Sequence, residues 1–266
     1  MEKKKLVQKM NNNNCFFLTN DDGYGAIGLK YLKKIVKQIS RDIWVFAPSK
    51  NQSAKSHSIT INKNINIRMA NKKEYIIKGT PADCVILGLE KIKNKKKNKN
   101  ILLISGINEG VNLGYDLLYS GTVAAAREGA LNNIKSIAIS IDKSNKKINW
   151  NALEYFAPKI LNEFIKIKLS NNFFLNVNFP SSDKGKIKGI KIVKMSERKP
   201  GKLKKIDNNN YIMPSERKIL RSAKANEDEF ELRQGFITVT IHDKSNFIAA
   251  NNNILKLKSI FRKNFE

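Results

Sequence analysis

The chain has 266 residues, 41% of them hydrophobic, which is long enough to bury a core without disulfide or metal support. Its formal net charge of +27 is compatible with attraction to polyanions. No stretch approaches the roughly 20 consecutive apolar residues that span a bilayer, so we expect no membrane partner. The two cysteines, Cys15 and Cys84, lie in apolar runs, as buried thiols of a reducing compartment do, and we therefore expect a cytoplasmic protein.

The positive charge is spread along the whole chain. Its densest run, 91–99, lies between two apolar segments, where a solvated loop is expected. The sequence contains no zinc-finger spacing and no aromatic pair of an RNA-recognition sheet, so we expect no specific nucleic-acid partner. A basic protein associated with nucleic acid remains the alternative function, and attraction caused only by scattered lysines would fall steeply with added salt.

The pattern of apolar residues predicts alternating strands and helices. The opening is a β-α-β unit, with strands at 16–18 and 43–46 and apolar residues at helical spacing from Leu29 to Ile39 between them. Strands so apolar, separated by helices, indicate an α/β, Rossmann-like fold with a mostly parallel sheet and helices on both faces. Later elements are predicted as strands at 75–77, 101–104 and 137–141 and helices at 81–91 and 121–131.

Two segments break this alternation. Residues 56–69 alternate polar and apolar side chains around Asn62 to Asn64, which predicts a β-hairpin, whereas 191–220 is polar and predicts an extended arm. Residues 236–241 predict one more strand. We therefore divide the chain into an α/β core, 1–183, and a C-terminal arm, strand and tail, 184–266.

Two adjacent carboxylates, Asp21 and Asp22, follow the first predicted strand directly. Ligands of open α/β sheets bind at the C-terminal ends of strands, so a site is expected here. Residues 20–23 also have the composition of an ordinary turn or helix cap. On their own they support a ligand site and a purely structural turn equally.

The segment Gly23 to Gly28 matches the G-x-G-x-x-G dinucleotide fingerprint literally. A pyrophosphate on that helix would meet Asp21 and Asp22 at close range, and like charges repel unless a cation lies between them. Residues 46–50, after the second strand, also contain no acidic side chain to bind a ribose. The two carboxylates therefore favour a divalent cation, which also attracts phosphate.

Two further segments open at the same edge of the predicted sheet. Residues 105–114 are rich in glycine and amide side chains, which suit an anion or a hard cation, although a tight structural loop explains the glycines equally well. Residues 119–129 predict a loop that enters a helix, whose N–H groups suit a phosphate. Simple capping by Ser120 or Thr122 is the equal alternative.

Together these segments resemble the SurE family of survival-protein nucleotidases. The resemblance covers about 15–142, continues at 234–240, and leaves 184–225 without a clear alignment. Two positions depart from the family pattern, because Ile27 and Ile241 stand where proline is expected. The blocks that carry the resemblance are Asn20 to Gly23 with Gly28, then Ala47 to Pro48 and Asn51 to Ser53 leading into Ser56 to Thr60, Gly79 to Val85, Ser105 to Asn108, and Tyr119 to Ala125.

The resemblance implies a metal-dependent phosphomonoesterase that hydrolyses nucleoside 5′- and 3′-monophosphates to nucleoside and phosphate. The preferred base and position stay open, as does cleavage of short polyphosphate. It also implies that the arm exchanges between subunits to form a homodimer or homotetramer. The implied site residues are Asp21, Asp22, Ser53 and Asn108 as metal ligands, with Asp21, Asp22 and Asn108 catalytic, and Ser120, Gly121 and Thr122 as the phosphate-binding segment.

Such an all-oxygen ligand set suits one Mg²⁺ or Mn²⁺ per subunit, with Ca²⁺ as a further candidate. We expect the metal to bind a phosphate oxygen and activate water, while Asn108 stabilises the phosphoryl charge and Asp21 or Asp22 accepts a proton. Direct carboxylate attack, giving an aspartyl-phosphate, stays open. His57 could protonate the leaving ribose oxygen, the alternative being a histidine that only satisfies a backbone group.

Overall fold

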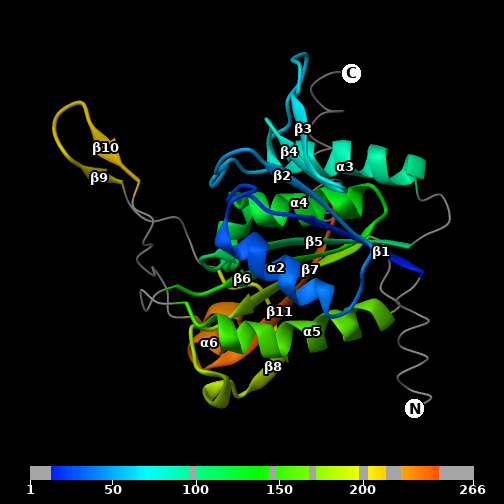
Figure 1. Cartoon of the computed structure of the whole chain (residues 1–266). Helices are drawn as coiled ribbons and strands as arrows, with labels where there is room; N and C mark the ends of the chain where they lie inside the picture. The colour runs from blue at the N-terminus through cyan, green and yellow to red at the C-terminus, as the bar shows by residue number, and fades with distance from the viewer. Residues whose placement is uncertain are drawn as a thin grey trace, which may run out of the picture.

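The computed structural model describes residues 13–95, 100–143, 148–167, 172–197, 203–213 and 223–245. In this part of the chain one nine-stranded sheet forms the centre, in the order β3-β4-β2-β1-β5-β6-β7-β11-β8. Figure 1 shows the sheet with helices packed against it. The strands are β1 (Asn14–Thr19), β2 (Ile43–Pro48), β3 (Ile67–Asn71), β4 (Glu74–Ile77), β5 (Asn100–Glu109), β6 (Lys135–Ile141), β7 (Phe173–Phe179), β8 (Gly189–Ile192) and β11 (Phe236–Asp243).

The sheet is mostly parallel, as the apolar strand pattern predicts. Only two of its pairs are antiparallel, β3 with β4 and β7 with β11. The chain leaves β1 for β2 on one side and later returns to pair β5 on the other side of β1. The gap between the C-terminal ends of β1 and β5 is therefore the topological switch point, where ligands of open α/β sheets bind.

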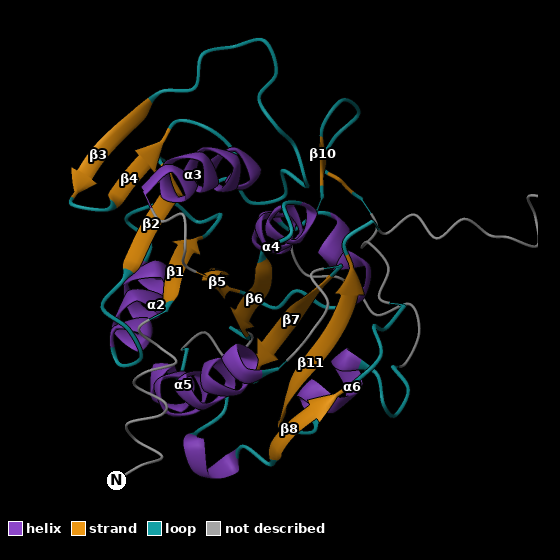
Figure 2. Cartoon of the chain, turned by 90° about the vertical axis from the view of Figure 1, so that its right-hand side faces the viewer, coloured by secondary structure: helices purple, strands orange, loops and turns teal. Residues whose placement is uncertain are grey.

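Helices cover both faces of the sheet. Figure 2 shows α2 and α5 on one face and α3 and α4 on the other. Short elements complete the described part: the 3₁₀ helices η1 (Gly114–Leu118) and η2 (Lys184–Lys186), and α6 (Asp228–Arg233). The long helices are α2 (Ile27–Lys37), α3 (Pro81–Lys95), α4 (Gly121–Leu131) and α5 (Trp150–Lys166).

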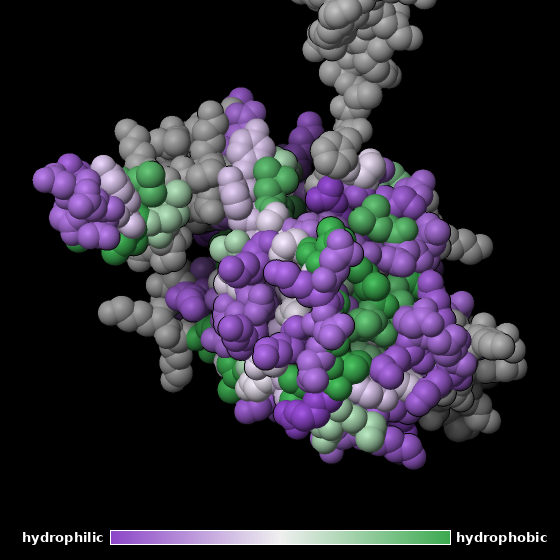
Figure 3. Space-filling view, turned by 90° about the horizontal axis from the view of Figure 1, so that it is seen from above, coloured by the Kyte–Doolittle hydropathy of each residue, from purple (hydrophilic) through white to green (hydrophobic). Residues whose placement is uncertain are grey.

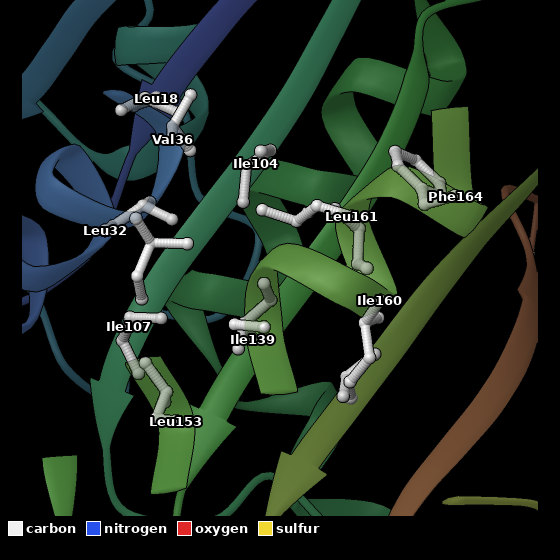
Figure 4. Close-up of a cluster of buried hydrophobic side chains, with 14 of the residues drawn as sticks. Leu18, Leu32, Val36, Ile104, Ile107, Ile139, Leu153, Ile160, Leu161 and Phe164 are labelled. Carbon is white, nitrogen blue, oxygen red and sulfur yellow. The ribbon is translucent and has the colours of Figure 1, made fainter. Parts of the chain in front are cut away.

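The alternation of side chains along β1 builds a core on each face. Phe16 and Leu18 join the cluster under α2 and α5, whereas Cys15 and Phe17 join the cluster under α3. Figure 4 shows the first cluster, where Leu32 of α2 and Leu161 of α5 lie over the sheet near Ile104. Burial of both sets fixes the register of β1, since a shift by one residue would exchange its two faces.

The predicted hairpin at 56–69 is wrong. Residues 56–66 form an irregular loop, and the true hairpin lies later, where β3 pairs with β4 through a turn at Lys72 and Lys73. The carboxylate of Asp83 holds the loop instead of a partner strand, because it accepts bonds from the Thr60 backbone and hydroxyl at 2.9 and 2.7 Å. We call residues 53–60 the His57 loop.

Two elements of the described chain were not among those predicted, α5 and β7. Pro158 lies inside α5, and a proline is a helix-breaking signal in any sequence pattern. The strand at 236–241 is confirmed as β11, which pairs β7 and thus joins the central sheet together with β8. The predicted division at 183/184 and the oligomeric role of 184–266 stay predictions.

Part of the predicted arm forms a separate small hairpin. Strands β9 (Lys204–Lys205) and β10 (Tyr211–Ile212) pair antiparallel and stand away from the sheet in Figure 1. Residues 198–202 and 214–222 of the arm lie outside the described residues. Among the described helices, none combines the length and the apolar composition that crossing a bilayer requires.

Candidate active site

The two adjacent aspartates lie at the switch point of the sheet. β1 ends at Thr19, and the buried Asn20 then turns the chain by donating from its Nδ2 to the carbonyl of Gly23 at 2.9 Å. Gly23 has a φ of +103°, a conformation that side chains with a Cβ rarely adopt. The turn thereby holds Asp21 and Asp22 at the edge, with Asp21 only 3% exposed.

Asp21 contacts the predicted phosphate-binding segment directly. The hydroxyl of Thr122 donates to Oδ1 of Asp21 in a short hydrogen bond. A Cβ at Gly121 would lie 2.7 Å from Cβ of Asp21, so only glycine lets the helix end approach so closely. The carboxylate and the N-terminus of α4 are therefore neighbours, although 101 residues separate Asp21 from Thr122.

Asp22 contacts the segment that carries Ser53. Asn51 donates from Nδ2 to Oδ1 of Asp22 at 3.1 Å, and its own Oδ1 accepts from the backbone of Ser53 at 2.8 Å. The backbone N–H of Gln52 also donates to the carbonyl of Asp21 at 2.7 Å. The exposed Ser53 is thus tied to the aspartates through Asn51, which the sequence did not single out as a site residue.

Asn108 lies at the C-terminal end of β5, the strand next to β1. Its Nδ2 donates to the carbonyl of Gly110 at 2.7 Å, which leaves the oxygen end of the amide as the acceptor. The next residue, Glu109, acts on Asp22 electrostatically. The structure therefore brings all seven predicted site residues to one edge of the sheet, while their roles stay predictions.

Burial makes the paired carboxylates costly to ionise. It raises the pKa of Asp21 to about 6, an effect that the Thr122 hydrogen bond opposes and the charge of Asp22 increases. Burial also raises the pKa of Asp22, whereas the Glu109 backbone and the Lys143 ammonium lower it. A divalent cation between them would stabilise both ionised forms, because opposite charge lowers a carboxyl pKa.

Four buried oxygens at the strand ends lack hydrogen-bond partners among the described residues: Thr19 Oγ1, Asn20 Oδ1, Asp22 Oδ2 and Ser105 Oγ. Thr19 ends β1, Asn20 and Asp22 follow it, and Ser105 lies in β5, the strand beside β1. A buried unpartnered oxygen is costly, so each one indicates a site for water or an ion. Oxygens of this kind are the ligands that Mg²⁺, Mn²⁺ and Ca²⁺ prefer.

The N-terminus of α4 supplies backbone donors beside Asp21. Ser120 caps the helix, accepting from the backbone N–H of Val123 at 3.1 Å. The capping alternative is therefore correct for the Ser120 side chain, whereas Thr122 uses its hydroxyl on Asp21. A capped helix N-terminus still offers positive potential for an anion.

His57 pairs with a carboxylate that the sequence did not indicate. Its Nε2 lies 2.8 Å from Oε2 of Glu128 on α4, 71 residues along the chain. The neighbouring Ser56 fixes the His57 loop, because its N–H donates to the carbonyl of Tyr119 at 3.1 Å and its hydroxyl to that of Leu118 at 2.6 Å. His57 therefore does not simply satisfy a backbone group.

His242 is the second histidine, and its imidazole lies on β11 against Phe174. Burial lowers its pKa to about 4, so we expect it to be neutral throughout the neutral range. Between pH 6.5 and 4 the unfolded chain binds a proton that the folded protein excludes, so this histidine makes the protein less stable as the pH falls through that window. NMR titration of the ring, assigned with His242→Gln, should give a midpoint near pH 4; a midpoint above 6 would contradict the burial argument.

Three comparisons with known proteins agree. The family model described as survival protein SurE matches residues 16–202. A 5′-nucleotidase SurE of Wolbachia sp. subsp. Drosophila simulans is 36% identical over 228 residues, 84% of this chain and 87% of that protein. That of Paramagnetospirillum magneticum is 40% identical over 185 residues, 69% of this chain and 70% of that protein. The crystal structure of the SurE protein from Aquifex aeolicus, 32% identical, covers 93% of this chain and 99% of its own with a TM-score of 0.79. The chain belongs to the SurE survival-protein family.

Proposed function

We propose that the protein is a metal-dependent phosphatase that hydrolyses nucleoside 5′- and 3′-monophosphates to nucleoside and phosphate. The observation that carries this proposal is the contact between the buried Asp21 and Thr122 at the start of α4. A carboxylate that suits a metal and a helix end that suits an anion lie side by side, an arrangement favourable for phosphoryl transfer. The similar proteins of Wolbachia and Paramagnetospirillum are 5′-nucleotidases, which supports the same activity.

The residues at the switch point fit one Mg²⁺ or Mn²⁺, with Ca²⁺ as a further candidate. Asp21, Asp22, Ser53 and Asn108 would hold it, and the unpartnered Oδ2 of Asp22 supports this assignment. When bound, the cation would neutralise the two carboxylates and draw charge from the phosphoryl group in the transition state.

The chain's own groups would bind the phosphate and move protons. The N–H groups at Gly121 and Thr122 would bind phosphoryl oxygens. The Thr122 hydroxyl would hold the Asp21 carboxylate beside this helix end. Asp21 or Asp22 would accept a proton from the attacking water. His57, oriented by Glu128, would donate a proton to the leaving ribose oxygen.

Phosphate release from a panel of nucleoside 5′- and 3′-monophosphates and short polyphosphate, with Mn²⁺, with Mg²⁺ and with chelator, tests this function. We expect release only with metal, and the panel assigns the preferred position. Release at an equal rate in chelator would overturn metal dependence. No release under any metal would overturn the enzyme assignment.

Metal binding should also be visible without catalysis. We expect Mn²⁺ or Mg²⁺ at about a hundredfold excess over Kd to add about 2.7 kcal/mol of stability, or roughly 5 to 10 °C in Tm for a chain of this size. Thermal denaturation with and without chelator measures the shift. Asp22→Asn should abolish most of it, and an undiminished shift in that variant would place the metal elsewhere.

We further propose that the protein is a homodimer or homotetramer held together through the C-terminal arm. The hairpin β9–β10 exposes Ile206, Tyr211 and Ile212 by more than half, at 52%, 55% and 53%. Figure 3 shows hydrophobic side chains next to hydrophilic ones on this projecting hairpin. Sedimentation equilibrium of the full chain should give two or four subunits, and a monomer would contradict the proposal.

A further inference from the structure

A cavity of about 220 Å³ lies beside the N-terminus of α4 and is lined in part by Ser120, Val123 and Ala124. We propose that it binds the nucleoside part of the substrate while the phosphate lies at the helix end. This inference rests on the proposed nucleotidase function and assigns the part of the site that distinguishes a nucleotide from other phosphate esters.

The N-terminal end of α4 borders both the predicted phosphate site and the cavity. Gly121 and Thr122 face Asp21, whereas Ser120, Ala124 and Arg127 line the cavity. Residues spaced by four and three along a helix share one face, so the cavity runs down α4 from its first turn. A ligand whose phosphate binds at the helix N-terminus would therefore place its remaining atoms along this face.

The walls have the chemistry of a nucleoside site. The rings of Phe174 and His242 lie against each other with centroids 5.4 Å apart at an angle of 27°, and both line the cavity. Bases stack on aromatic rings with little dependence on sequence, and His242 is the partly exposed ring of this pair, since Phe174 is only 1% exposed. The low pKa of His242 keeps its ring uncharged, which suits contact with a neutral base.

Polar groups lie at defined points of the same cavity. Arg127 is held in place because its Nε donates to the carbonyl of Lys244 at 3.0 Å and its Nη2 to that of Ser245 at 3.4 Å. Tyr115 adds a hydroxyl, and none of the described lining residues is an aspartate or glutamate. This environment suits a neutral ring with hydrogen-bond acceptors and disfavours a cationic ligand.

His57 belongs to the loop that also carries the predicted metal ligand Ser53. It lines the cavity while its ring contacts Glu128. The bonds from Ser56 to Leu118 and Tyr119 attach the His57 loop to the cavity wall. His57 is thus near the junction of phosphate and nucleoside, where the leaving ribose oxygen would be.

A larger cavity of about 670 Å³, lined by Tyr31, Trp150 and Asp183 among others, does not compete for this role. Its described lining contains none of the predicted metal ligands or phosphate-binding residues. A nucleotide bound there would have its phosphate away from Asp21 and Thr122.

Filling the cavity should separate nucleotides from small esters. Two substitutions add volume: Ala124→Leu on the helix face, and Met195→Trp, a lining residue that is 40% exposed. The matched control is Ile190→Trp on β8, 48% exposed and outside the cavity lining. The measurements are kcat/KM for adenosine and uridine 5′-monophosphates and for glycerol phosphate, and equilibrium binding of adenosine alone.

We expect each filling variant to lower kcat/KM for the nucleotides about tenfold more than for glycerol phosphate, and to weaken adenosine binding to the same extent. Ile190→Trp should behave like the wild type on all three. Equal losses for nucleotides and glycerol phosphate, or undiminished adenosine binding, would overturn the cavity assignment. If the wild type hydrolyses no ester, the proposed function fails, and adenosine binding still decides whether the cavity is a nucleoside site.

Discussion

Asp22→Asn should lower kcat/KM for nucleoside monophosphates by about three orders of magnitude or more, because a bound metal supplies several kcal/mol of transition-state stabilisation. The substitution removes the charge and the proton acceptor but keeps the shape of the side chain. Asn51 can still donate to the retained Oδ1, as it does to Asp22 at 3.1 Å. Phosphate release with saturating Mn²⁺ measures the loss.

The fold of this variant should survive. Burial raises the pKa of Asp22, so replacing the charge with a neutral amide should not destabilise the metal-free protein at neutral pH. The matched control is Glu163→Gln, the same chemical change on the exposed outer face of α5, which should retain full activity. Wild-type turnover by a folded Asp22→Asn protein would show that Asp22 takes no part in the mechanism. The basic surface and nucleic-acid association would then have to be tested as the alternative.

The sequence predicted what depends on local pattern. Apolar runs identified β1, β2, β5 and β6, and parallel strands necessarily bring their C-terminal ends to one edge. The position of Asp21, Asp22 and Asn108 therefore followed from strand order alone. The helix start at Ser120 could also be recognised, because capping residues have a local signature.

Contacts between distant segments could not be predicted in this way. Nothing near His57 indicates that Glu128 will be its partner, since the pair forms only when the His57 loop lies over α4. The alternation at 56–69 suggested a hairpin, but Asp83 provides the bonds that a partner strand would have made. Tertiary contacts thus overrode a local strand pattern, a common outcome because strand propensity depends on context.

The glycines of the dinucleotide fingerprint show how one pattern can serve another purpose. In that fingerprint the third glycine permits close packing of helix on strand. Gly28 does the same here, because a Cβ on it would lie 1.9 Å from the carbonyl oxygen of Ile107 in β5. The match therefore reflects close packing of α2 on β5 beside a pair of aspartates, and the charge argument against a pyrophosphate is unaffected.

Gly28→Ala should therefore be strongly destabilising, by about 3 kcal/mol or more, since a backbone carbonyl cannot move aside as a flexible side chain can. Gly25→Ala is the matched control in the same turn, because a Cβ there meets nothing within 4 Å. We expect that variant to lie within about 1 kcal/mol of the wild type. Urea unfolding of the three metal-free proteins measures the difference.

Because Gly28 follows Asp22 closely and Ile107 precedes Asn108, forcing α2 from β5 should also separate these predicted ligands and weaken metal binding. Equal unfolding midpoints for Gly28→Ala and Gly25→Ala would show that α2 can shift without cost, and the close approach would then not be what holds the aspartates beside β5.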